Sequence, residues 1–228
     1  MVEIQLRGEL WDNDSTDILR WWGWRDITAP MDIQAALEAA GGDEVTLLVN
    51  SPGGDMAVGN EIRSMLRRYR GKTTALIQGM GASAATLAAA GCGTIQAEPG
   101  ALLCYHNPQG GAQGDFREMR RNADGLENAR EGILEIYLAR GVKVDRAGLV
   151  ELLDQDIWIN PGRALEYGLI DEIVGAGEAA DPAAFVAAGS RIRLTAAMRD
   201  AYREHVADTR RKEAARCALA KARALAKY

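Results

Sequence analysis

The sequence has few residues that could cross-link the chain or bind a metal. It contains only three cysteines, Cys92, Cys104 and Cys217, and only two histidines, His106 and His205. The cysteines are too few and too scattered for a disulfide framework, and none belongs to a CxxC pair that would offer a zinc site. We therefore expect reduced thiols and no bound metal.

Long apolar runs and a secretory leader are also absent. No stretch approaches the ~20 consecutive apolar residues of a membrane-spanning helix. Residues 1–4 lack the basic start and apolar run of a secretory signal. A hydrophobic fraction of 47% with 26% charged residues is that of an ordinary globular protein. We expect a cytoplasmic protein with no membrane partner.

Charge is distributed unevenly along the chain. The net charge is −5, but residues 191–228 carry 11 Lys and Arg against 4 Asp and Glu, whereas residues 1–190 carry 16 against 28. The asymmetry indicates either a separate module that attracts an acidic partner or nucleic acid, or a solvated helix with one basic face. Residues 176–190, rich in Gly and Ala, have the composition of a linker before this tail, which we expect to be helical.

Strand and helix patterns alternate in the first half of the chain. The expected strands lie at 3–8, 44–50, 73–78, 93–97 and 101–105, and the expected helices at about 33–40, 58–69 and 83–90. This alternation predicts an α/β fold with a largely parallel sheet covered by helices.

The second half of the chain is predicted to be mainly helical. Residues 115–140 have an apolar stripe between charged faces, which predicts one long helix that projects and packs its apolar stripe on another surface. Asn160-Pro161 supplies an N-cap followed by proline at the first helical position, so a short helix should begin there. It should end at Gly168, before a strand at 169–174.

Two glycine-rich turns could expose backbone N–H groups beside a nucleophile. Residues 50–54 follow a strand, and residues 79–85 lie where a strand gives way to a helix. A helix N-terminus stabilises negative charge, and a Gly-Gly turn lets a second N–H approach the same point, as an oxyanion hole requires. Ser83 would start the small-residue helix with its hydroxyl facing a cleft. Taken alone, it could equally be a capping or packing residue.

A histidine and an aspartate could complete a catalytic set with Ser83. His106 lies at a strand end, and a general base must come within about 3 Å of the hydroxyl that it activates. His205, in the basic tail, is the weaker candidate. Asp156, at the edge of a strand, could orient the imidazole and stabilise the imidazolium. Asp154 lies one turn away, and the residues alone do not separate the two aspartates.

Two motif near-misses narrow the reaction class. Gly71-Lys72-Thr73 ends like a phosphate-binding loop, but Leu66 stands where the first glycine belongs, so we expect no nucleotide there and no other cofactor. Residues 81–85 nearly match GxSxG. The chain order here is Ser, His, Asp, whereas the α/β-hydrolases run Ser, Asp, His. The order argues against a common α/β-hydrolase.

A further set of segments is specific in its order and spacing. The segments are 50–54 (Asn-Ser-Pro-Gly-Gly), 79–83 (Gly-Met-Gly-Ala-Ser), 105–108 (Tyr-His-Asn-Pro), the glycines of 110–114, and 156–160 (Asp-Ile-Trp-Ile-Asn) leading into 164–171. With these segments the chain resembles the ClpP family of serine peptidases over about residues 3–175. The resemblance implies a ClpP/crotonase-like α/β fold of repeated ββα units, with a projecting handle helix at about 107–141 and, beyond the fold, the C-terminal helical extension.

The resemblance also implies roles for individual residues. Ser83 matches the nucleophile, His106 the base and Asp156 the third member of the triad. The oxyanion donors would be the backbone N–H groups of Gly54 and Ala84. The strand that pairs with extended substrate would consist of Gly110, Gly111, Ala112, Gln113 and Gly114. Family members form hexameric or heptameric rings, often stacked through the handle, so self-assembly is implied.

Within the ClpP-like branches, the chain is most similar to the phage and prophage head-maturation proteases. Met1 lies almost at the opening strand and leaves no room for the N-terminal hairpin of housekeeping members, which argues against an AAA+ unfoldase partner. The tail is a second departure from those members. The resemblance implies cleavage of scaffold or capsid proteins without an ATPase, in a bacterial host cytoplasm or assembling prohead, with the tail as a docking or self-processing segment.

We therefore expect a peptidase domain over residues 1–175, a linker at 176–190 and a basic extension at 191–228. Three alternatives stay open. The chain could be a Clp proteolytic subunit driven by an AAA+ unfoldase, or a ring scaffold that has lost activity. It could also be a crotonase-like acyl-CoA enzyme, which would share the fold and an oxyanion hole of two backbone amides.

Asp55 departs from the family pattern. It follows Gly54, where many ClpP members carry an apolar residue. A carboxylate so close would oppose a developing oxyanion if it pointed inward. We expect Asp55 instead to cap the helix that begins there.

Overall fold

The computed structural model describes residues 1–175 and 194–225, the last nine of these as backbone only. The strands are β1 (Val2–Leu10), β2 (Ile27–Thr28), β3 (Val45–Gly54), β4 (Thr73–Ala82), β5 (Thr94–Ala97), β6 (Leu102–Cys104), β7 (Trp158–Ile159) and β8 (Glu172–Ile173). Within the described residues they form one sheet in the order β2-β1-β3-β4-β5-β8, with β6 beside β4 and β7 beside β6. Every pairing is parallel except that of β6 with β7, as the alternating pattern predicted.

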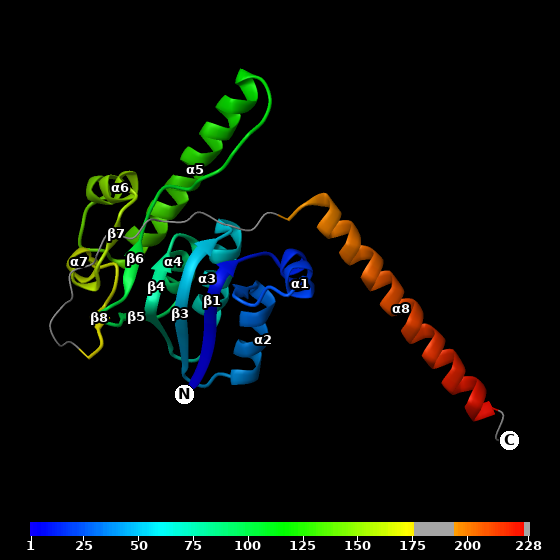
Figure 1. The fold of residues 1–228 in the computed structure, drawn as a ribbon. Helices are drawn as coiled ribbons and strands as arrows, with labels where there is room; N and C mark the ends of the chain where they lie inside the picture. The colour runs from blue at the N-terminus through cyan, green and yellow to red at the C-terminus, as the bar shows by residue number, and fades with distance from the viewer. Residues whose placement is uncertain (176–193, 226–228) are drawn as a thin grey trace.

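Helices cover the sheet and extend beyond it (Figure 1). They are α1 (Asn13–Trp21), α2 (Pro30–Ala40), α3 (Met56–Arg68), α4 (Ala84–Ala89), α5 (Phe116–Arg140), α6 (Arg146–Gln155), α7 (Pro161–Tyr167) and α8 (Ala196–Leu225). α4 packs against β3 and α3, and α3 also packs against α2. None of the described helices is long and apolar enough to cross a membrane.

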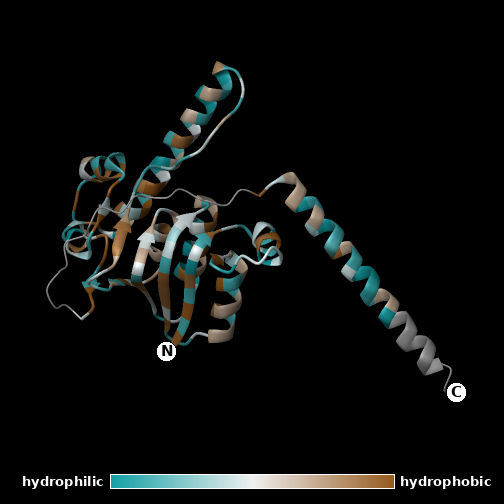
Figure 2. Ribbon diagram, viewed as in Figure 1, coloured by the Kyte–Doolittle hydropathy of each residue, from teal (hydrophilic) through white to brown (hydrophobic). Residues whose placement is uncertain are grey.

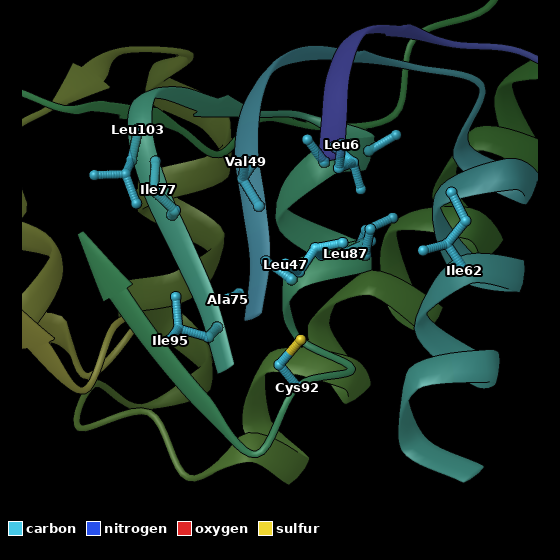
Figure 3. Close-up of a cluster of buried hydrophobic side chains, with 14 of the residues drawn as sticks. Leu6, Leu47, Val49, Ile62, Ala75, Ile77, Leu87, Cys92, Ile95 and Leu103 are labelled. Atoms are coloured by element: carbon cyan, nitrogen blue, oxygen red, sulfur yellow. The ribbon is translucent and has the colours of Figure 1, made fainter. Parts of the chain in front are cut away.

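The core lies between the central strands and the helices α3 and α4. In β3 the five residues from Val45 to Val49 are all buried, including both faces of the strand, as is typical of a central strand in a parallel sheet. Leu47 and Val49 face Leu87 of α4 within the cluster drawn in Figure 3. Removing a side chain such as that of Leu47 would leave a cavity and cost about 2–5 kcal/mol.

The helix α5 projects from the body and is packed only at its base. Asp115 caps its N-terminus, and Gly141 ends it in the left-handed conformation. Ile133, Leu134 and Tyr137 are its buried residues, whereas Phe116 at the far end is 64% exposed. Hydrophobic residues accordingly gather in the sheet and the base of α5 (Figure 2). The long helix expected at 115–140 is thereby confirmed.

Several elements differ from the sequence-based expectations. The helices α1 and α6 and the two-residue strand β2 were not predicted. The strand expected at 169–174 is reduced to β8, because Leu169 and Ile170 are buried in the turn that precedes it. The capped helix expected after Asn160 is confirmed, with Asn160 Oδ1 accepting from the Arg163 N–H at 2.9 Å. The linker expected at 176–190 lies outside the described residues.

Candidate active site

Ser83 stands at a sharp turn between β4 and α4. Its backbone has φ 54° and ψ −129°, a conformation that residues other than glycine rarely adopt. The Ser83 N–H donates to the Cys104 carbonyl at 2.9 Å, and the Thr86 hydroxyl donates to the Ser83 carbonyl at 2.6 Å. Its own side chain caps no helix N–H, which removes the capping alternative. Strained backbone of this kind clusters at active sites and presents the side chain at the strand end.

A buried pair of hydroxyls supports this turn. Thr86 Oγ1 lies 2.7 Å from the Tyr137 hydroxyl oxygen, and both side chains are buried. Tyr137 also packs edge-on against Tyr105, with ring centroids 5.4 Å apart. Burial raises the pKa of Tyr137, so its phenol stays neutral near pH 7. The base of α5 is thus fastened to the turn that carries Ser83.

Gly53 allows a second backbone segment to approach Ser83. Its φ is +91°, and a Cβ at this position would lie 2.6 Å from the Ser83 Cβ, so no other residue fits without displacement. The Gly53 N–H donates to Ser51 Oγ at 3.0 Å, and that hydroxyl donates to the Gly8 carbonyl at 2.6 Å. A shift in strand register just before Ser51 marks a bulge, a feature common beside active sites.

The two predicted oxyanion residues lie on the same pocket as Ser83. Ala84 is the first residue of α4, so its N–H has no acceptor within the helix. Gly54 has φ +149°, and a Cβ there would collide with the backbone of Leu10. Ala84 thus has an N–H without an acceptor within α4, and the absence of a side chain at Gly54 lets β3 pack directly on Leu10.

One pocket of about 720 Å³ brings the predicted catalytic residues together. Ser83 reaches it from the turn before α4, His106 from the segment after β6, and Asp156 from the end of α6. His205 does not line this pocket, since its ring stacks on Trp21 with centroids 4.9 Å apart. Of the two histidines, His106 is thus the one that lines the pocket with Ser83.

Within the described residues, no hydrogen bond yet joins Ser83 to His106 or His106 to Asp156. His106 Nδ1 lies 2.7 Å from the carbonyl oxygen of Asn107. The Asn107 side-chain amide donates to Asp154 Oδ1 at 2.7 Å, so Asp154 holds the segment that follows His106. The two aspartates left open by the sequence thus have different partners.

Asp156 ends the helix α6 and lies just before the strand β7. It adopts the left-handed conformation with φ 48°, which turns the chain toward β7. The Cys104 thiol donates to its Oδ1 at 3.8 Å, a weak contact with a sulfur donor. The strand beside which Asp156 was expected is therefore present as β7, but the helix α6 that Asp156 ends was not recognised from the sequence.

The buried thiols should be inert in the native protein. Burial, followed by the charge of Asp156, raises the pKa of Cys104 to about 12, and burial raises that of Cys92 to about 12. In a Cys217→Ser variant at pH 8, iodoacetamide should modify neither thiol until urea is added, because the thiolate is the reactive form. Mass spectrometry would read out the modification. Fast labelling of Cys104 in the native chain would contradict the prediction.

The raised pKa values of Cys92 and Cys104 also predict how the stability of the fold changes with pH. Unfolded thiols ionise near pH ~8.5, well below the folded pKa values. The neutral thiols therefore contribute fully below that pH, and stability falls as the pH rises above it, because only the unfolded state gains thiolate. Thermal melts between pH 8 and pH 10 of the wild type and a Cys92→Ala, Cys104→Ala variant would separate this contribution from other titrations.

Asp55 caps α3 as expected, and its side chain is the acceptor. Its Oδ1 accepts from the Ala57 N–H at 2.7 Å and from the Val58 N–H at 3.3 Å. An Asp55→Ala change should lower the free energy of unfolding by about 1 kcal/mol, whereas Asp55→Asn, which keeps an acceptor, should change it much less. Urea unfolding of both variants tests this. A strong rise in turnover in Asp55→Asn would point instead to repulsion between this carboxylate and the oxyanion.

The predicted substrate strand is not a strand in the single chain. Residues 110–114 are exposed and irregular, and Gly110 lies against Leu126 on the flank of α5. An isolated strand lacks hydrogen-bond partners until another segment pairs with it, which explains the difference. The backbone of this segment is accordingly available to a second chain.

Sequence reasoning missed the supporting residues Thr86, Tyr137 and Asn107. A local signal existed only for Thr86, which follows Ser83 at the spacing of one helical turn. In the part of the chain that the structure describes, no group of three or more His, Cys, Asp or Glu side chains could hold a metal ion.

Comparison with known proteins bears on both family and fold. A family model described as Clp protease matches residues 30–177, more than half of the chain. Among solved structures, a mutant ClpP1 from Listeria monocytogenes is similar over 75% of this chain and 90% of that chain, with a TM-score of 0.60 and 20% identity. The structural similarity confirms the ClpP-like α/β fold.

Proposed function

Because the chain belongs to the Clp protease family, we propose that it is a serine endopeptidase with Ser83, His106 and Asp156 as its triad. The observation that carries the proposal is the strained Ser83 turn, which opens on a pocket also lined by His106 and Asp156. Acyl transfer uses this constellation of a serine hydroxyl, an imidazole base and a carboxylate. Acyl-CoA chemistry of the crotonase type would not need it.

In the proposed reaction, Ser83 Oγ attacks the scissile carbonyl carbon while His106 Nε2 takes the hydroxyl proton. His106 then gives that proton to the leaving amine nitrogen, and water hydrolyses the acyl-enzyme by the same route. Asp156 would accept a hydrogen bond from His106 Nδ1 and stabilise the imidazolium. The ring must therefore turn from the Asn107 carbonyl to Asp156, on assembly or on substrate binding, as catalytic contacts often tighten only in the complex.

Negative charge on the carbonyl oxygen would be stabilised by the backbone N–H groups of Gly54 and Ala84. Such donors act on charge that develops only in the transition state, so they lower the barrier more than they strengthen substrate binding. The close packing of Gly53 on Ser83 supports this assignment, because it brings the β3 turn next to the nucleophile.

The proposed substrate is an extended peptide with an apolar side chain near the scissile bond. One wall of the pocket consists of Leu126, Ala129 and Ile133 from α5, with Leu87 from α4. The backbone of residues 110–114 would pair with the peptide as an added strand, which reads main chain more than side chains.

We further propose a ring of six or seven copies that cleaves scaffold or capsid proteins of a phage head without an ATPase. Exposed Phe116 and Met119 at the far end of α5 support assembly through this helix, since exposed apolar side chains often mark protein contacts. The excess of Lys and Arg in the tail supports the proposal that it docks on an acidic partner. Sedimentation velocity would measure the mass of the assembly and hence the number of copies in the ring. Degradation that needs ATP and an unfoldase would favour the Clp-subunit alternative.

The test of the nucleophile is covalent labelling of assembled protein with a fluorophosphonate. Wild type should carry the label on Ser83, located by mass spectrometry, and Ser83→Ala should carry none. Ser15→Ala is the matched control, because Ser15 lies on the same pocket and should not be the labelled residue. Labelling that persists in Ser83→Ala would overturn the proposal.

A further inference from the structure

The start of α8 and the residues just before it are docked on the body beside α1. Leu194 and Met198 pack against a small cluster formed by Leu19 and Ile27, apart from the main core. Further along the helix, Tyr202 meets Trp21 edge-on with ring centroids 6.0 Å apart. This part of the basic extension is therefore held in one position against the peptidase body, while the rest of α8 projects away from it (Figure 1).

This docking brings Arg199 into the catalytic pocket. Arg199 is the one Lys or Arg among the described residues that line the pocket, and its charge acts on Asp12, which lines the same pocket. It is half-buried, and its guanidinium forms no hydrogen bond or ion pair with a described residue. The five N–H donors of this guanidinium therefore have no hydrogen-bond acceptor among the described residues, and the side chain lines the pocket.

The carboxylates of the same pocket are already engaged by the chain. They are Glu9, which accepts from Trp11 Nε1 at 2.9 Å, Asp12, which accepts from the Ser15 N–H at 2.8 Å, Asp55, which caps α3, and Asp156, which accepts from Cys104. Burial alone would raise the pKa of Asp12. The hydrogen bonds that Asp12 accepts from Ser15 and the positive charge of Arg199 outweigh that effect, so the pKa of Asp12 is lowered overall. Arg199 thus interacts electrostatically with Asp12 without forming a hydrogen bond to it, so its donors stay available.

We propose that Arg199 forms a subsite that selects a peptide with an acidic side chain, Asp or Glu, on the α1 side of Ser83. The inference rests on the proposed peptidase function and deepens it. A guanidinium matches a carboxylate in a bidentate, charge-assisted pair, and partial burial protects such a pair from screening. The C-terminal extension would then be a wall of the active site as well as a docking segment.

The test uses the full chain and acetylated, amidated Ala–Leu peptides with one Glu at successive positions, each beside its Gln counterpart. At one position, wild type should cleave the Glu peptide about tenfold faster in kcat/KM at low salt. Arg199→Ala should lose this ratio, with the larger fall in kcat/KM for the Glu peptide. Arg199→Glu should reverse the preference. Equal rates for Glu and Gln at every position in wild type would overturn the subsite.

The control variant is Arg203→Ala, which should keep the preference. Arg203 lies one turn further along α8, pairs with Asp200 at 3.3 Å, has a 76% exposed side chain and does not line the pocket. If Arg203→Ala lost the ratio of Glu to Gln cleavage as fully as Arg199→Ala, the positive charge of the helix as a whole would be responsible. That result would overturn the subsite.

Binding to Ser83→Ala separates the subsite from the nucleophile. Fluorescence anisotropy of the labelled Glu and Gln peptides needs no turnover, so it reports on Arg199 even if Ser83 takes no fluorophosphonate. Tighter binding of the Glu peptide that disappears in Ser83→Ala, Arg199→Ala would support the subsite. Labelled Ser83 with no Glu preference in binding or cleavage would sink the subsite and leave the peptidase proposal standing.

Discussion

A Ser83→Ala variant should lose peptide cleavage by about a millionfold in kcat while remaining folded and assembled. The loss is large because nucleophile and base act as a unit. Without the Ser83 hydroxyl, the base has no proton to accept. Stability should change little, since the Ser83 side chain caps no N–H group and Ala has a Cβ in the same place. A fluorogenic peptide assay on assembled protein measures the first effect, and thermal unfolding measures the second.

A Ser83→Gly variant provides the matched control for backbone strain. It should be equally inactive but more stable than Ser83→Ala by about 1 kcal/mol, because glycine adopts a positive φ without the steric cost of a Cβ. Equal stability of the two variants would show that the turn is not strained. If either variant kept more than a trace of the wild-type activity, Ser83 would be excluded as the nucleophile.

An Asp156→Asn change should lower kcat/KM by about ten thousandfold. In the proposed triad, the amide would favour the wrong imidazole tautomer and could not stabilise the imidazolium. The pH dependence of kcat/KM should change as well, which a merely structural role would not produce.

An Asp154→Asn change is the comparison that separates the two aspartates. Asp154 accepts from the Asn107 amide at 2.7 Å and pairs with Arg130 at 3.4 Å, and an asparagine oxygen can keep the first of these bonds. Activity should therefore fall by no more than about threefold, since the exposed ion pair is worth little. The reverse order of effects, with Asp154 dominant, would reassign the third member of the triad.

Local rules predicted much of the framework from the sequence. Apart from α1 and β2, the order of strands and helices through β6, the long helix α5 and the caps at Asp55 and Asn160 depend on residue pattern and on hydrogen bonds between near neighbours, which the sequence displays directly. The helices α1 and α6 were missed because they are short, and their buried residues take meaning only from the surfaces that they cover.

Spacing alone did not identify the candidate site, and the family resemblance supplied its residues. Ser83, His106 and Asp156 come from three separate elements, and the parallel register of β4 and β6 with the end of α6 brings them to one pocket. The positive φ of Ser83 and of Asp156 is likewise imposed by surrounding contacts, because neither residue type favours it enough to signal it.

The sequence by itself determined the alternating α/β pattern, the acidic body and the basic helical tail, because composition and periodicity are local properties. Only the tertiary structure decided that Ser83 lies in a strained turn, that Asp154 and Asp156 have different partners, and that α8 docks on α1 and brings Arg199 to the pocket. These features depend on contacts between residues far apart in the chain, whose energies exist only once the core has placed them together.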